Sequence, residues 1–280
     1  MSTYSMAAPL AIQISYNHQC MIFSDFNNQK IVILELSSKQ LKRVLPKQSG
    51  SVCLERNYNN KNQDALFIVS SLCIVKFDLH QLLTNNFNEQ MALWTSEKLK
   101  NPSSMVVHES RQLFVTDTTD VKVFNTRNGQ LLQVIQMPVN VKRVTGIDFF
   151  DHDTMIVGEG NPYNRLIVFK NVQNDNAENS ERKFVWQFEK QLVESTASKN
   201  SSWSYSMYLT VDKASLNIIA CDCYDHSIKI YTQHGDLLKS IGTSGSNLQQ
   251  FRYPQGLCLD ELTGELYVSD TDNSRIQIFK

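Results

Sequence analysis

The sequence lacks any long apolar run. Its longest apolar stretches are five or six residues, far short of the roughly 20 that a membrane-spanning helix needs. The N-terminal stretch MSTYSMAAPLAIQISY has neither a basic segment nor a sustained apolar core, so it does not resemble a signal peptide. We therefore expect no membrane association and a cytoplasmic location.

The six cysteines show no metal-binding pattern. Cys221-Asp222-Cys223 is not a CxxC pair, and no second pair accompanies it as a zinc site would require. Most of the cysteines lie within apolar runs, where a thiol behaves as a small buried hydrophobe. We predict that they are reduced and structural, which suits a cytosolic protein.

The formal net charge is close to zero, at −1 for 280 residues. The protein therefore has no overall attraction to polyanions or to anionic membranes, and nucleic-acid binding would need a local basic surface. A chain of this length can bury about three quarters of its unfolded surface, so it needs no metal or disulfide to be stable.

What the sequence does contain is a repeat, clearest in residues 253–280. This segment, YPQGLCLDELTGELYVSDTDNSRIQIFK, has three short apolar stretches (256–259, 266–269 and 276–279) separated by the turn sequences LTG and TDN. The pattern predicts a meander of three strands. It fits the start of the chain without a gap at an offset of 245 residues, which places Pro254 on Pro9 (254 − 9 = 245).

Four more copies lie between these two, at residues 51–77, 102–124, 144–169 and 208–231. Their mean spacing is about 49 residues (245 over five steps), and periods of 40 to 50 residues with several strands per unit are typical of propeller blades. Fourth apolar segments follow in five units: Gln40–Leu45, Met91–Trp94, Leu131–Met137, Phe184–Phe188 and Leu237–Ile241. The sequence predicts an all-β fold, a six-bladed β-propeller of four-stranded antiparallel blades.

The predicted propeller is one domain over residues 1–280. Its blades cover approximately residues 9–50, 51–100, 101–142, 143–190, 203–246 and 254–280, with polar insertions at 171–183 and 195–206. The sequence ends at Lys280, just after the third strand of the last unit, so we expect that blade to be three-stranded. How the ring closes, and whether the sequence is a piece of a longer multidomain protein, stay open.

An acidic residue closes the second strand in five of the six units: Asp25, Asp117, Glu159, Asp222 and Asp270, with Ser70 in the other unit. A carboxylate at a strand end can accept N–H groups of the turn that follows. We predict that these acids are structural rather than catalytic.

The last unit, P-x-G-L-x-L-D-x4-G-E-L-Y-V-S-D-T-D-N-S-R-I-Q-I-F, resembles the NHL repeat, although Ser274 stands where that family usually has His. The first and fifth units are recognisable and the other three are degenerate. The resemblance implies a six-bladed propeller of the kind found in TRIM-NHL and other ubiquitin-ligase proteins. It also implies a relationship to RNA-binding propellers and to propeller lyases and lactonases.

Catalytic chemistry is not indicated. No GxSxG, HExxH or P-loop motif is present, and the six histidines fall on the rims of different blades, where we expect them not to converge. One carboxylate among the side chains predicted to face the axis cannot form a metal cage; that row is Gln13, Cys53, Val106, Asp148, Thr210 and Cys258. We expect no enzyme activity, no metal and no cofactor.

The predicted partner surface is the connector face, formed by the connectors between blades and the loops between second and third strands. It carries basic and aromatic residues: Lys47, Lys98, Lys100, Lys142, Arg143, Tyr163, Tyr224, Arg252 and Tyr253. Acids share this face and offset the charge: Asp117, Asp120, Asp225 and Asp272. We predict that the face binds a protein or peptide, with substrate recognition for a ubiquitin ligase as the role implied by the resemblance. Single-stranded RNA is the alternative ligand.

Overall fold

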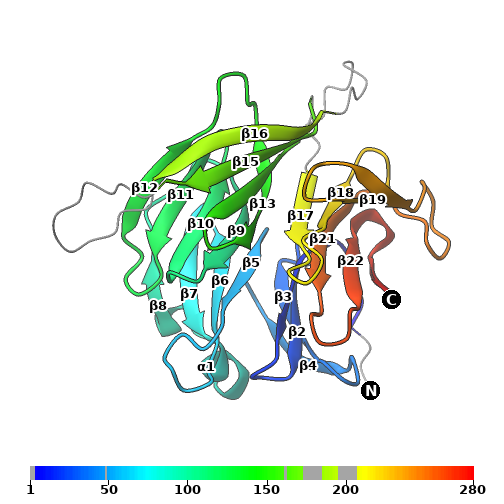
Figure 1. The fold of residues 1–280 in the computed structure, drawn as a ribbon. Coiled ribbons are helices and arrows are strands. Elements are labelled where there is room, and N and C mark those ends of the chain that lie inside the picture. The colour runs from blue at the N-terminus through cyan, green and yellow to red at the C-terminus, as the bar shows by residue number, and fades with distance from the viewer. Residues whose placement is uncertain (1–3, 48, 161–162, 173–184, 195–206) are drawn as a thin grey trace, which may run out of the picture.

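The short apolar segments of each repeat form antiparallel strands that pair in chain order within one sheet (Figure 1). The computed structural model describes residues 4–47, 49–160, 163–172, 185–194 and 207–280. Blades one to three consist of β1 (Pro9–Ser15), β2 (Cys20–Asp25), β3 (Lys30–Glu35), β4 (Leu41–Leu45); β5 (Val52–Glu55), β6 (Ala65–Ser70), β7 (Cys73–Asp78), β8 (Ala92–Thr95); β9 (Pro102–His108), β10 (Gln112–Asp117), β11 (Asp120–Asn125), β12 (Leu131–Gln136).

The remaining three blades follow the same plan. They consist of β13 (Val144–Asp151), β14 (Thr154–Glu159), β15 (Arg165–Asn171), β16 (Trp186–Glu194); β17 (Met207–Val211), β18 (Ile218–Asp222), β19 (Ser227–Tyr231), β20 (Leu237–Ile241); β21 (Pro254–Leu259), β22 (Leu266–Asp270), β23 (Arg275–Phe279). The prediction of a six-bladed propeller whose last blade has three strands is confirmed. The predicted insertions lie almost wholly outside the described residues.

The register within the blades reproduces the 245-residue offset of the sequence repeat. In blade one Pro9 pairs with Asp25 and Ile12 with Phe23, and in blade six Pro254 pairs with Asp270 and Leu257 with Val268. Both sheets have a register shift directly after the proline. A first-strand proline is tolerated there because it need not donate to the ladder.

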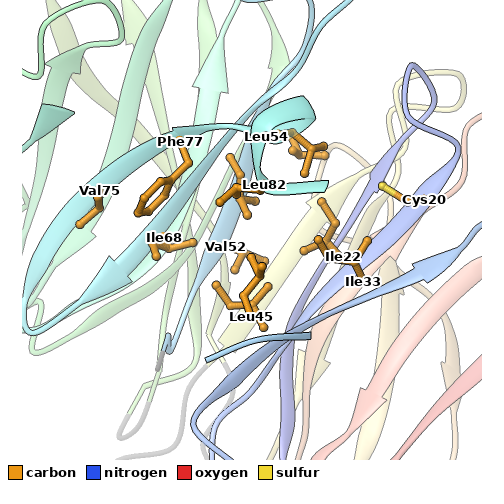
Figure 2. Close-up of a cluster of buried hydrophobic side chains, with 13 residues drawn as sticks. Cys20, Ile22, Ile33, Leu45, Val52, Leu54, Ile68, Val75, Phe77 and Leu82 are labelled. Atoms are coloured by element: carbon orange, nitrogen blue, oxygen red, sulfur yellow. The ribbon is translucent and has the colours of Figure 1, made fainter. Parts of the chain in front are cut away.

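The hydrophobic core is divided among the seams between neighbouring blades. Six buried clusters each combine residues of two adjacent blades, and together they run around the whole ring. Figure 2 shows the seam between blades one and two, where Ile22 and Ile33 face Val52 and Ile68. A small sheet buries its two faces against its neighbours, so no blade has a complete core of its own.

Blade six closes on blade one without exchanging a strand among the described residues. Tyr267 packs with Phe23 and Val32 in one cluster, and blade six reaches the backbone of blade one through three hydroxyl groups. These hydrogen bonds are Ser269 Oγ to Leu10 O (2.6 Å), Thr271 Oγ1 to Pro9 O (2.9 Å) and Ser274 Oγ to Ala7 O (2.8 Å). Side-chain hydrogen bonds and apolar packing therefore close the ring.

Blade two contains a helix that the sequence analysis did not predict. Helix α1 (Leu79–Thr84) follows β7, and two short 3-10 helices, η1 (Glu89–Met91) and η2 (Thr271–Asn273), lie before β8 and β23. The Asp78 carboxylate caps α1 by accepting from Gln81 N–H (2.9 Å). Leu79 and Leu82 of α1 are buried in the seam with blade one, so the helix is part of the core.

Candidate functional site

The first strand of every blade lines the axis of the ring. A narrow axial cavity of about 100 Å³ is lined by residues of β1, β5, β9, β13, β17 and β21. Its lining includes four residues of the row predicted to face the axis: Gln13, Val106, Asp148 and Thr210. The Asp148 carboxylate is bound to blade five, because it accepts from Val211 N–H (2.7 Å), Thr210 Oγ1 (3.0 Å) and Lys213 Nζ (2.9 Å).

Two pairs of histidines lie close together across neighbouring blades. The rings of His108 and His152 are 4.8 Å apart, and those of His18 and His80 are 6.4 Å apart. Each pair spans two adjacent blades, which the fold brings together. Burial lowers the pKa of His18 and of His108, which favours neutral rings at physiological pH. Within the described part of the chain, no group of three or more His, Cys, Asp or Glu residues is placed to hold a metal ion.

The five acids at the ends of second strands are buried, and their main role differs from the predicted one. Asp222 does accept an N–H of the following turn, from Asp225 (3.1 Å). The other four accept backbone N–H groups from the connector that precedes their own blade; the bonds are Ala8 N to Asp25 (2.9 Å), Asn101 N to Asp117 (2.6 Å), Lys142 N to Glu159 (2.7 Å) and Arg252 N to Asp270 (2.7 Å). The acids therefore fix the incoming connector to the blade.

A basic side chain from the third strand or its turn also pairs with four of these acids. The ion pairs are Lys122–Asp117 (2.7 Å), Arg165–Glu159 (2.5 Å), Lys229–Asp222 (2.6 Å) and Arg275–Asp270 (2.8 Å). Burial alone would raise the pKa of Asp117, but the Lys122 ammonium and the connector N–H groups hold it below its ordinary value. The pKa of Asp25 is likewise lowered, because hydrogen bonds from Ala8 N–H and Tyr4 outweigh its burial. Asp25 and Asp117 are therefore ionised at neutral pH, and their oxygens are used in contacts within the fold.

The predicted partner residues lie around the connector end of the ring, in different sectors. Lys98, Lys100, Lys142 and Arg252 are exposed, whereas Lys47 is paired with Glu89 (2.6 Å). Arg143 is partly buried at the start of blade four.

The three predicted tyrosines differ in exposure. The Tyr163 ring lies 4.5 Å from the Arg165 guanidinium, and the Tyr253 ring lies 4.7 Å from the His226 ring. Tyr224 is 40% exposed. Of these three rings, Tyr224 is the most exposed.

Sequence reasoning missed a depression of about 550 Å³ at the opposite end of the ring. It lies on the hairpin face, formed by the loops between first and second strands and between third and fourth strands. Its lining includes Cys53, Arg56, Val106 and Arg111 from blades two and three. The arginines come from loops that are distant in the sequence, so no local motif indicates the site.

The fold and this geometry define a six-bladed β-propeller with a narrow axial cavity and a depression on its hairpin face. An NHL repeat family model matches residues 251–279, which is the repeat that carries the resemblance. This match and the six-bladed ring support an NHL-type propeller. No curated protein matches the chain in sequence.

Solved structures share the fold at low sequence identity. The β-propeller domain of Cps50 (Swd1) from Myceliophteria thermophila superposes with a TM-score of 0.64 at 10% identity and covers 99% of this chain and 98% of that one. An auxiliary nutrient binding protein from Bacteroides ovatus gives 0.68 at 11% identity, covering 99% and 70%. Hydrazine synthase from Kuenenia stuttgartiensis gives 0.59 at 8% identity, covering 100% and 97%. At these identities the likeness concerns the fold alone.

Proposed function

We propose that this propeller is a non-catalytic interaction module that binds an acidic protein or peptide segment on its connector face. One observation carries the proposal. Asp117 and Glu159 are already paired with Lys122 and Arg165, and the acids lie at or below 1% exposure. They therefore contribute little negative field at the surface of blades three and four.

The exposed cations of the same sector are Lys98, Lys100 and Lys142. They precede blades three and four, and the backbone N–H groups of Lys100 and Lys142 are fixed by Asp117 and Glu159. A partner therefore meets cations on a rigid backbone, which lowers the entropic cost of binding. Complementary charge at the rim of an interface raises the association rate and favours an acidic partner.

Selection from a peptide library, followed by calorimetry on the enriched peptide, tests the proposal. We expect an acidic consensus and a loss of binding of about tenfold or more in the Lys98→Glu/Lys100→Glu/Lys142→Glu variant, since several rim charges are reversed. The matched control is Lys239→Glu, an exposed lysine on the outer strand β20. Failure to enrich any common sequence, or equal loss in the control, contradicts the proposal.

Single-stranded RNA is the second candidate, because the same three lysines favour a phosphate backbone. The two candidates differ in their response to salt, since phosphate binding weakens steeply as salt rises. Filter binding of a mixed-sequence RNA at two salt concentrations distinguishes them. RNA-binding surfaces stack bases on aromatic rings. Because few of the tyrosines predicted for this face are exposed, a peptide ligand is favoured over RNA.

The cellular role that we propose is substrate recognition for a ubiquitin ligase in the cytoplasm. The resemblance of the NHL-type repeat to ligase-associated propellers supports the ligase role. The cytoplasmic location is supported by the six cysteines, none of which forms a disulfide bond, as expected in a reducing compartment. No helix in the described part of the chain is long and apolar enough to cross a membrane. Ubiquitination of the selected partner, compared in cells with and without this protein, tests the ligase role.

A further inference from the structure

The depression on the hairpin face combines apolar and cationic groups. Its apolar lining comes from Cys53 and Leu54 of β5 and from Met105 and Val106 of β9. Two arginines, Arg56 and Arg111, complete it at the ends of the same two strands. A volume of about 550 Å³ lies within the range of small-molecule sites, which are commonly largely apolar with a few fixed polar groups.

Arg111 is held in place by the neighbouring loop. Its guanidinium donates to Tyr58 O (2.9 Å) and to Asn60 Oδ1 (2.6 Å). A guanidinium has five N–H donors, so these two bonds fix its position and leave donors for a ligand. The side chain is partly buried, which strengthens its interaction with an anion relative to a fully solvated charge.

Arg56 is positioned by stacking rather than by a strong ion pair. Its guanidinium carbon lies 5.0 Å from the centre of the Tyr16 ring. Its closest carboxylate is Glu261 at 3.5 Å, and the two side chains are 49% and 48% exposed. Exposed pairs of this kind are weak, so the Arg56 charge can be shared with a ligand.

The loop that carries these groups is anchored by a fully buried carboxylate. Asp64 accepts from Ser15 Oγ (2.6 Å), Asn17 Nδ2 (2.7 Å) and Asn57 N–H (2.9 Å). It therefore ties the loop after β5 to blade one. This arrangement fixes the backbone next to Arg56, so the site is built before a ligand arrives.

The positive charge of the site is only partly compensated. Glu55 also lines the depression, but its carboxylate is buried against Lys76 Nζ (2.6 Å) and Thr126 Oγ1 (2.9 Å). His108 is buried and its Nε2 lies 2.9 Å from His152 O. Glu109 of the lining and Glu261 beside Arg56 are the remaining acids near the two guanidinium groups. Both are exposed, so solvent weakens their interaction with the arginines.

We propose that this depression binds an organic carboxylate with an apolar portion, held by Arg56 and Arg111 against the Val106 wall. Arginine suits this ligand because its planar fork matches a carboxylate in two-point hydrogen bonding. The carboxylate belongs either to a free organic acid or to the C-terminus of a peptide. The site lies at the opposite end of the ring from the connector face, and it does not depend on the function proposed for that face.

Two matched probe pairs test the proposal with the whole chain. The first pair is 3-phenylpropionate and its primary amide, and the second is a phenylalanine-terminated hexapeptide with a free or an amidated C-terminus. Binding is measured by calorimetry and by ligand-detected NMR. The variants are Arg56→Gln and Val106→Glu, with Arg127→Gln as the control, because Arg127 is an exposed arginine of the same face outside the depression. Unfolding midpoints verify that each variant is folded.

We expect at least one acid to bind and its amide to bind roughly tenfold to a hundredfold more weakly, because hydrogen bonds to a charged group are lost. Arg56→Gln and Val106→Glu should lower the affinity for the acid to a similar extent. Arg127→Gln should leave this affinity unchanged. Preference for the free acid or for the peptide identifies the source of the carboxylate. Equal binding of acid and amide, equal loss in Arg127→Gln, or no binding of either acid at millimolar concentration overturns the proposal.

Discussion

At Gly256, blade six lies directly against the backbone of blade one. A Cβ atom at this residue would lie 1.7 Å from Leu10 O and 2.9 Å from Ser269 Oγ. Cβ atoms essentially never approach other atoms within 3.0 Å, so Gly256→Ala must open the seam by at least 1.3 Å (3.0 − 1.7). The displaced Leu10 O is the acceptor of the Ser269 hydroxyl at 2.6 Å.

The expected cost follows from these contacts. Overpacking typically costs about 1–3 kcal/mol, and losing the Ser269 hydrogen bond adds about 1 kcal/mol. We predict that Gly256→Ala lowers the free energy of unfolding by about 2–4 kcal/mol. For a chain of this size that corresponds to a decrease in Tm of about 3–7 °C.

Urea unfolding and calorimetry measure the effect, with Gly50→Ala as the matched control. Gly50 also lines the axial cavity, but a Cβ there meets nothing within 4 Å. Both substitutions reduce the entropy of the unfolded chain equally, so their difference isolates the contact in the seam. If the two variants unfold at the same midpoint, blade six is not locked against blade one as described, and the account of ring closure is wrong.

Two further predictions concern the buried charges. Because the folded-state pKa of Asp117 is lowered, its contribution to stability is complete above the unfolded-state pKa of about 3.9 and is lost as the pH falls through the lower folded value. Asp117→Asn should therefore destabilise the protein at pH 7 and flatten the loss of stability as the pH falls below about 4. An unchanged pH profile, measured by urea unfolding, contradicts this. Replacing Lys76 by Met leaves Glu55 buried without its 2.6 Å partner and should cost about 3–5 kcal/mol. The double variant Lys76→Met/Glu55→Gln should recover part of that loss, and a double variant as unstable as the sum of the single variants would argue against the pair.

The sequence predicted the blades well because each strand is a local pattern. The turn sequences and alternating apolar residues of the last unit recur at Pro9 with the same spacing, and the paired residues Pro9–Asp25 and Pro254–Asp270 occupy matching register positions. Helix α1 was missed because it lies inside a connection that the repeat pattern does not cover. Its signals are local but weak: a capping Asp78 and two leucines three residues apart.

The partners of the strand-end acids could not be read from the repeat. The sequence indicated that Asp117 ends a strand, and the turn after it was the nearest source of N–H donors. In the folded chain the connector before the blade returns to the same point, so the N–H of Asn101, sixteen residues earlier, is the donor instead. Proximity in the sequence therefore predicted the wrong donor for the Asp117 carboxylate.

Periodicity and turn chemistry within about 50 residues were sufficient to predict the number of blades and the strands within them. How blade six meets blade one, and which residues line the depression on the hairpin face, became visible only in the folded ring. Both depend on contacts between residues brought into proximity by closure of the ring, such as Ser269 with Leu10 or Arg111 with Tyr58. No repeat unit contains that information, because it arises only when neighbouring blades pack.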